Sequence, residues 1–310
     1  MSLAAKNLAD LMFAYIDQSG TSGPSGDVNN ATAAEKAAIA LAMTQAVQEA
    51  RKINPSIFAR RVGTVLRAAA SGTITVTQFS TAATLGTLVV PNDGCTVRIS
   101  SGLDNELNQN PGDSSYVLRR PHEGTSGSQT AQIWNDCWVV DDGTTYEGIL
   151  GTVTANGRPI EEVRSANQLD RYRLINDYGQ PTYARLRTTG IIAAVMCEQW
   201  ASPFVSKIQM RLRFAPMPAS LTTIEADLVI AAPKFSATDI LSTTTTFQIP
   251  EQIDELVLFP IAMKKMMAQS IFRAPKETRD ELNEQYKSAV ETLKSLRGHY
   301  GGGNRIDVRP

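Results

Sequence analysis

The sequence predicts an α+β protein in which a helical domain built from both chain ends carries an inserted antiparallel β domain. Residues 1–60 and 233–298 repeat apolar side chains every three or four positions, which is typical of amphipathic helices. Residues 61–232 hold short β-branched runs separated by Gly, Asn, Asp and Pro, which indicates strands and turns. Residues 299–310 contain three successive glycines and are expected to form an extended C-terminal arm. The 310 residues are enough for two domains.

Two helices are expected before the β region. Apolar residues from Leu3 to Ile16 form one stripe, and residues 19–30 (SGTSGPSGDVNN) end it. Thr32 and Glu35 have the spacing of a capping box, in which each side chain satisfies a free amide at the helix start. The second helix is expected to end before Asn54, because a proline disfavours helical backbone in the residue that precedes it.

The β region is expected to consist of short strands. They are predicted at residues 62–69, 73–79, 86–90, 96–100, 116–119, 133–140, 172–175, 182–188, 205–214 and 224–230. Turn-forming residues lie between several of them, as at 92–94 (NDG), 110–112 (NPG) and 141–143 (DDG). The DDG segment is interpreted as a hairpin turn.

Two further helices are expected after Pro250. Residues 253–271 have a helical period, and Pro260 lies early enough to kink this helix without ending it. The last helix begins after Pro275 and is expected to stop at Gly298. Its first turns are acidic and its last turn is basic, which suits the helix dipole.

Composition gives no sign of bulk electrostatic binding to nucleic acid or membranes, because the formal net charge is -1. The three cysteines, Cys95, Cys137 and Cys197, form no CxxC motif and are expected to be reduced thiols, mostly buried. The first twenty residues lack the apolar region of a signal peptide. We therefore expect synthesis and assembly in a reducing cytoplasm.

No motif for catalysis is present in the sequence. His122 and His299 are isolated, so neither a zinc motif nor a nucleophile–base pair is apparent. The acidic pairs at 141–142 and 161–162 are adjacent and do not converge as the two carboxylates of a glycosidase do. The expectation is a protein without enzyme activity, cofactor or metal. A carboxylate site assembled by the fold is the alternative.

Two stretches alternate arginine with other residues, at Arg171 and Arg173 and at Arg185 and Arg187. On a strand, such alternation would place a positive row on one face, facing DNA or a neighbouring subunit. The alternative is a solvated strand face on which the arginine stems cover apolar surface.

The order of these elements resembles that of the head-to-tail adaptor proteins of short-tailed bacteriophages, the portal-bound connectors of the virion neck. The likeness covers nearly the whole chain. Local stretches that resemble the family are residues 46–50 (AVQEA), 54–58 (NPSIF), 66–68 (LRA), 73–76 (TITV), 94–99 (GCTVRI), 118–121 (LRRP), 124–125 (GT), 211–218 (RLRFAPMP) and 256–259 (LVLF).

The resemblance implies a structural protein that forms a ring beneath the portal, joins the DNA-filled head to the tail and lines the DNA exit channel. Its partners would be the portal protein, copies of itself in a dodecameric ring, a tail nozzle or tube protein, and the DNA passing through. Identical subunits in a closed ring make heterologous contacts. The protein would be assembled in the host cytoplasm and would contact no membrane. The alternatives are a tail tube or nozzle component and a virion-associated hydrolase.

The C-terminal arm is the predicted partner-binding segment. Gly301, Gly302 and Gly303 form a flexible tether. An extended segment behind it can add to the edge of a partner's sheet, with its apolar side chains in pockets. The arm would dock on the portal or on a neighbouring subunit; the alternative is a frayed terminus. The docking residues are Asn304, Arg305, Ile306, Val308 and Arg309.

Overall fold

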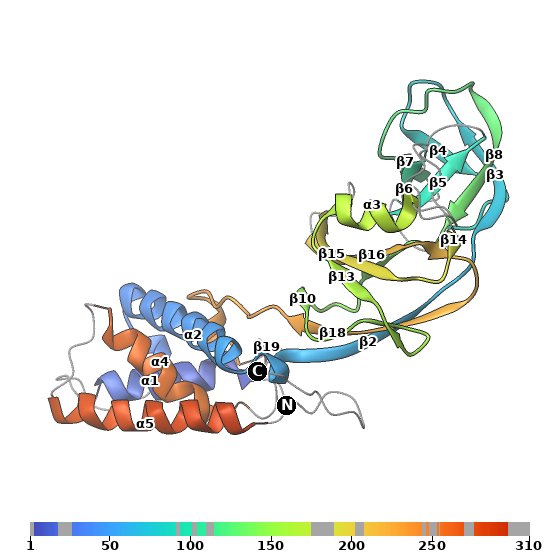
Figure 1. Ribbon diagram of the computed structural model, residues 1–310. Helices are drawn as coiled ribbons and strands as arrows, with labels where there is room; N and C mark the ends of the chain where they lie inside the picture. Colours follow the sequence, from blue (N-terminus) through green and yellow to red (C-terminus); the bar gives the residue numbers. More distant parts are fainter. Residues whose placement is uncertain are drawn as a thin grey trace. The chain divides into compact units, whose positions relative to one another are not determined.

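The computed structural model describes residues 3–17, 27–90, 94–100, 104–109, 115–174, 189–201, 208–243, 246–247, 253, 255–269 and 276–296 (Figure 1). It contains helices and sheets, so the predicted α+β class is confirmed. The chain divides into two compact units. The helical unit draws its described residues from Met1–Ala59 and from Ala231 onward, and the β unit from Arg60–Ile230.

Within the described residues, four α-helices make up most of the helical unit, and each corresponds to a helix expected from the sequence. Three short 3-10 turns and one two-stranded antiparallel ladder accompany them. The helices are α1 (Ala5–Asp17), α2 (Ala33–Ile53), α4 (Glu255–Met267) and α5 (Lys276–Ser295). The turns are η1 (Val28–Asn30), η2 (Pro55–Phe58) and η3 (Asp239–Leu241), and the ladder joins β1 (Leu3–Ala4) to β19 (Thr246–Phe247).

Local signals in the sequence locate these helices well. The capping box is confirmed: the Thr32 hydroxyl accepts a hydrogen bond from the Glu35 amide at 3.3 Å, and the Glu35 carboxylate accepts one from the Thr32 amide at 2.7 Å. Pro260 lies inside α4, and the helix continues past it. Helix α5 ends at Ser295, and the predicted stop at Gly298 lies outside the described residues.

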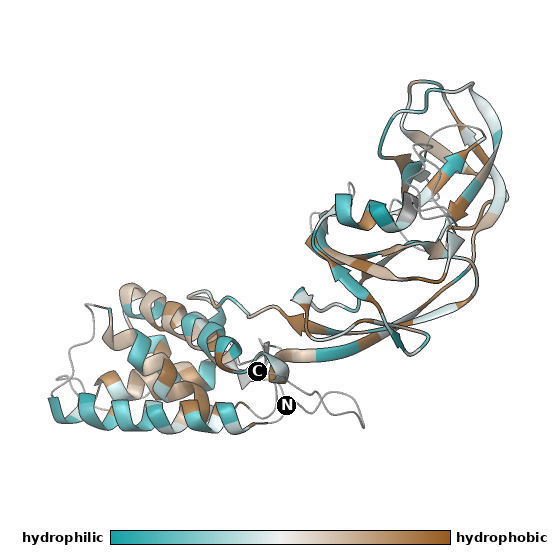
Figure 2. Cartoon of the chain, viewed as in Figure 1, coloured by the Kyte–Doolittle hydropathy of each residue, from teal (hydrophilic) through white to brown (hydrophobic). Residues whose placement is uncertain are grey.

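Helices α1, α2 and α4 supply most of the apolar core of this unit. Figure 2 shows α5 as mainly hydrophilic, and its buried apolar side chains include Leu282 and Leu293. Fully burying one large aliphatic side chain contributes about 1.5–3 kcal/mol, so this core favours the helical assembly well beyond helix propensity alone. Large buried side chains of these three helices include Leu8, Met12, Ile39, Met43, Leu258, Ile261, Met263 and Met266, and Ile57 and Phe58 of η2 are buried as well.

The first half of the β unit is a closed barrel of antiparallel strands in the order β3-β4-β7-β6-β5-β8. Inward-facing side chains such as Ile74, Val97 and Leu107 fill its core. The strands are β3 (Ala70–Val76), β4 (Ala82–Leu85), β5 (Cys95–Ile99), β6 (Asn105–Gln109), β7 (Ser115–Leu118) and β8 (Gly127–Trp134).

The second half of the β unit has two larger sheets around one core, which includes Leu66, Trp138, Phe214 and Leu228. One sheet contains β2 (Ala59–Leu66), β10 (Tyr146–Ile149), β11 (Thr154–Ala155), β12 (Arg158–Pro159) and β18 (Thr222–Ile230). The other contains β9 (Cys137–Val140), β13 (Glu161–Val163), β15 (Ala194–Ala201) and β16 (Ile208–Ala215). A small ladder joins β14 (Thr189–Gly190) to β17 (Met217–Pro218).

The β unit differs from the sequence prediction in its strand directions. Its ladders are mainly antiparallel, but β13 pairs with β15 and β14 pairs with β17 in parallel. Parallel neighbours need a long crossover connection. Between β13 and β15 that connection includes helix α3 (Ala166–Leu174), whose Leu169 packs on Ala194 and Met196.

Four predicted strand features are wrong. Residues 172–174 lie in helix α3, so the predicted strand 172–175 is incorrect. Residues 86–88 turn over β3, where the amides of Gly86 and Leu88 both bond to the Thr73 carbonyl. Segment 133–140 splits between β8 and β9. The DDG turn connects two sheets and is no hairpin, because β9 pairs with β16 and β10 pairs with β18. Segment 182–188 lies outside the described residues.

Candidate functional site

The predicted binding residues fall mostly outside the described part of the chain. Arg185 and Arg187 lie there, as does the whole arm from Gly301 to Arg309. Arg171 and Arg173 belong to helix α3, where Arg171 is exposed. The predicted strand is therefore wrong for this pair, because residues 171–174 belong to a helix.

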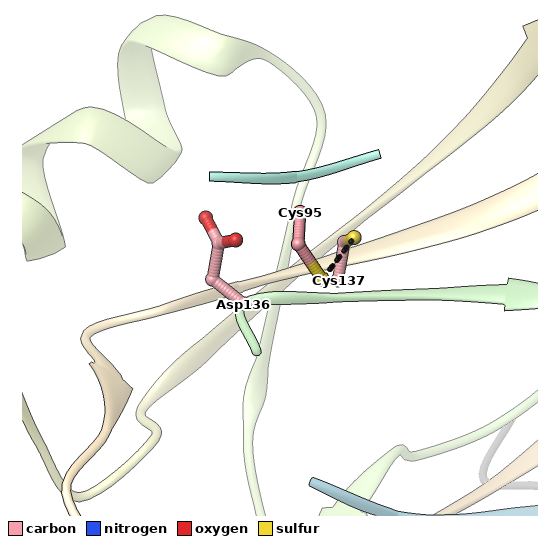
Figure 3. Close-up of side chains that lie close together, drawn as sticks. All are labelled: Cys95, Asp136 and Cys137. Atoms are coloured by element: carbon pink, nitrogen blue, oxygen red, sulfur yellow. Dashed lines mark hydrogen bonds between the residues drawn. The ribbon is translucent and has the colours of Figure 1, made fainter. Parts of the chain in front are cut away.

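A buried thiol pair is the most closely assembled group of reactive side chains among the described residues. Cys95 begins β5 and Cys137 begins β9, and both are buried. The Cys137 thiol donates to Cys95 Sγ at 3.6 Å, and the Cys95 thiol donates to Asn135 Oδ1 at 3.8 Å. Figure 3 shows the two sulfur atoms facing each other.

Asp136 and Thr96 hold the two cysteine-bearing strands together. Asp136 Oδ1 accepts a hydrogen bond from the Thr96 amide at 3.0 Å, and Oδ2 accepts one from the Thr96 hydroxyl at 2.8 Å. The Phe214 amide also donates to the Asp136 carbonyl at 2.8 Å. Hydrogen bonds to a buried carboxylate are strong. Because Thr96 follows Cys95 and Asp136 precedes Cys137, these bonds fix the cysteines beside each other.

Cys95, Asp136 and Cys137 offer two sulfur atoms and a carboxylate oxygen, all within 4.8 Å of one another. Such ligands suit zinc, which binds sulfur at about 2.3 Å and oxygen at about 2.0 Å. However, both Asp136 oxygens already accept hydrogen bonds from Thr96, and Figure 3 shows the carboxylate apart from the sulfur pair. The arrangement is thus better suited to chemistry between the two thiols.

The sequence prediction of buried thiols is confirmed for Cys95 and Cys137, whereas Cys197 is partly exposed. Their contact was missed, because the cysteines lie 42 positions apart and form no local motif. The signal that finds them is strand register: Thr96 pairs with Trp134, which puts Cys95 close to the start of β9.

A buried ion-pair network links the barrel to the second sheet within the β unit. Arg211 on β16 bonds through Nη1 to Glu106 of β6 at 2.9 Å and through Nε to Glu198 of β15 at 2.7 Å. Its guanidinium lies 5.2 Å from the centre of the Trp200 ring. Burial lowers the pKa of Arg211, but the two carboxylates outweigh burial and raise it overall. The charge is therefore retained inside the protein.

A cavity of about 470 Å³ at the barrel is lined in part by His122. His122 Nε2 is buried without a hydrogen-bond partner among the described residues. A Cβ atom at Gly124 would lie 2.7 Å from this nitrogen, so the glycine permits the close approach. Arg120 donates to the Asp104 carbonyl at 2.5 Å, and Asp104 pairs with Arg98 at 2.7 Å. Two of the charged groups that line the cavity, Asp104 and Arg120, are thus already bonded within the barrel.

An exposed groove of about 420 Å³ lies at the β11–β12 hairpin and the β14–β17 ladder. Ile191 on its wall is 77% exposed and Leu221 nearby is 66% exposed. Large exposed aliphatic side chains close to a groove are a property of surfaces that contact other proteins.

No protein-family model matches the chain, and no curated protein is recognisably similar to it. Among the described residues, no helix is long and apolar enough to cross a bilayer. The function is therefore argued from the chain's organisation and its side chains.

Proposed function

We propose that the chain is a head-to-tail adaptor, a virion structural protein that forms a ring beneath the portal and joins the DNA-filled head to the tail. The observation that supports this role most is the division of the chain, because the helical unit draws on both chain ends and the β unit lies between them in sequence. The resemblance to the adaptors rests on the layout predicted from the sequence, a discontinuous helical domain with an inserted antiparallel β domain.

The barrel favours an adaptor over a tail tube or nozzle component. A tube would be expected to close its sheets between subunits. Here six strands close a barrel within one chain, so their edges are already paired. In this proposal, contacts between subunits use side-chain surfaces such as the groove beside Ile191 and Leu221.

The ion pairs of three acidic residues in the β unit favour a structural role over a hydrolase. Asp104 pairs with Arg98, Glu106 with Arg211, and Asp142 with Arg60. Carboxylates held in ion pairs are poorly placed to exchange protons with a substrate. In this proposal, Arg171, Arg173, Arg185 and Arg187 contact DNA or a neighbouring subunit.

Electron microscopy of the purified full-length chain, alone and mixed with the portal protein of the same phage, tests the adaptor role. The expected result is a dodecameric ring or a collar bound to the portal. A chain that stays monomeric with portal present, and that degrades cell-wall polymer, would instead identify the hydrolase. Rings that stack into tubes without portal would identify a tail component.

The arm is tested by deleting residues 301–310. If it docks on the portal or a neighbouring subunit, the shortened chain stays folded by circular dichroism but no longer joins heads to tails. A matched control replaces residues 301–303 with serines, which keeps a flexible tether and should keep joining. Unimpaired joining by the deletion variant would rule out the docking role.

A further inference from the structure

The Cys95–Cys137 contact has a chemical consequence that does not depend on the adaptor role. The two sulfur atoms are 3.6 Å apart, and a disulfide bond is about 2.05 Å long. The gap that remains between the two sulfur atoms is therefore about 1.5 Å. The hydrogen bonds of Asp136 with Thr96 keep the strands in the register that maintains this contact.

We propose that Cys95 and Cys137 are an oxidation site at which an intrachain disulfide forms, covalently joining β5 of the barrel to β9 of the second sheet. The oxidant is a small disulfide such as oxidised glutathione. The thiolate of one cysteine attacks it, forms a mixed disulfide and releases one glutathione thiolate. The second cysteine loses its proton, attacks the protein sulfur of the mixed disulfide and displaces a second glutathione thiolate. Two thiols are oxidised, and one small disulfide is reduced to two thiols.

The surroundings of the pair favour this product over a metal complex. A disulfide is neutral, so it leaves no new charge in a site whose residues are buried. The third cysteine is a poor competitor: burial, together with the charges of Glu162 and Glu198, raises the pKa of Cys197 to about 11. Its thiolate is therefore scarce at neutral pH.

Burial controls how fast the bond forms. Cys95 and Cys137 are both almost completely shielded from solvent, so an oxidant reaches them only when the strands open locally. We therefore expect slow oxidation of the native chain, accelerated by urea below the unfolding midpoint. Once formed, the bond closes a long loop of the unfolded chain and stabilises the folded β unit.

Intact mass spectrometry of the full chain incubated with oxidised glutathione tests the proposal. The expected result is a mass loss of about 2 Da, reversed by dithiothreitol. Arg98 and Arg119 lie between the two cysteines, so trypsin separates them unless a disulfide joins the fragments. The joined fragments should contain Cys95 and Cys137, and the thermal midpoint should rise by roughly 5–10 °C.

Matched variants locate the bond. C197S should give the same mass loss, whereas C95S and C137S should not. Asp136→Ala should oxidise faster, because without both bonds to Thr96 the two strands open to the oxidant more often. A native wild-type chain that keeps three free thiols over days, or a bond through Cys197, would overturn the proposal. So would stoichiometric Zn²⁺ binding that blocks oxidation and is abolished in both C95S and C137S.

Discussion

At the residue scale, Arg211 has the most consequential side chain in the β unit. Only 3% of it is exposed, yet it carries a full charge balanced by Glu106 and Glu198. A buried ion pair often contributes little net stability, but removing one partner leaves the other charge buried and uncompensated. Arg119 also pairs with Glu106, at 3.2 Å, and is 65% exposed.

Arg211→Met should therefore lower the free energy of unfolding by about 3–5 kcal/mol, because Glu106 loses its buried partner and Trp200 loses its cation contact. Urea denaturation of the full-length chain, followed by tryptophan fluorescence, measures the change. Arg119→Gln is the matched control and should cost less than about 1 kcal/mol, because its ion pair is exposed. Equal losses in the two variants would contradict a dominant role for Arg211.

For single residues, burial could be predicted from the sequence in part, but contact partners could not. The three cysteines were expected to be mostly buried, because free cysteine is usually buried, and the structure agrees for Cys95 and Cys137. Which thiol contacts which depends on the register of β5 against β8, and no local pattern encodes that register. Arg211 was likewise indistinguishable from Arg213, because both lie on the same face of β16 and only the contacts of Arg211 with Glu106 and Trp200 bury it more deeply.

At the element scale, Glu49 joins three helices of the helical unit. Its carboxylate on α2 accepts a hydrogen bond from the Tyr286 hydroxyl of α5 at 2.5 Å and forms an ion pair with Lys265 of α4. Burial raises the pKa of Glu49, but these bonds outweigh burial and lower it below the ordinary 4.5. The same carboxylate, with burial, raises the pKa of Tyr286 to about 12.

The pH dependence follows from these directions. A carboxylate with a lowered pKa in the fold stabilises it above its ordinary pKa of 4.5, and this stabilisation is lost as pH falls through the lowered value. At pH 7, Glu49→Gln should cost about 1–2 kcal/mol of unfolding free energy. The difference in unfolding free energy between this variant and the wild type should shrink below pH 4. Urea denaturation followed by circular dichroism of the helices measures this difference at each pH. The control is Glu291→Gln, which should change the unfolding free energy little at any pH because the ion pair of Glu291 with Lys294 is exposed. If Glu49→Gln cost the same free energy at every pH, the Glu49 carboxylate would not have the lowered pKa assigned to it.

Helices were predicted more accurately than strands because their signals are local. The Thr32 capping box and the apolar period after Pro275 each lie within a few residues of the element they define. Strand β6 (NELNQ) has a polar sequence and exists because β5 and β7 pair with it from either side. Asn54 was interpreted only as a helix end. Its side-chain amide (Nδ2) also donates hydrogen bonds to the carbonyls of Leu293 and Leu296, at the C-terminal end of α5.

At the scale of the whole molecule, the change from helical to strand period near residue 60 and back near residue 232 indicated two kinds of segment. In the structure the described residues of the β unit run from Arg60 to Ile230. The sequence could not indicate that the β segment contains both a closed barrel and a pair of larger sheets, because both use short strands of similar composition. The ring and its partners stay predictions, because they depend on surfaces of other chains.

The division of the chain predicts that residues 60–230 fold without the helical unit. The segment has its own cores, and the strands at its two ends, β2 and β18, are hydrogen-bonded neighbours. It is also long enough to bury most of its apolar surface alone.

The isolated fragment of residues 60–230 should unfold cooperatively in urea and keep the native rate of Cys95–Cys137 oxidation. A matched fragment of residues 70–230 lacks β2 and should lose several kcal/mol, because β18 loses a neighbour and Leu66 leaves the core. A 60–230 fragment that unfolds gradually and oxidises as fast as a denatured chain would show that the helical segments are needed for the β unit to fold.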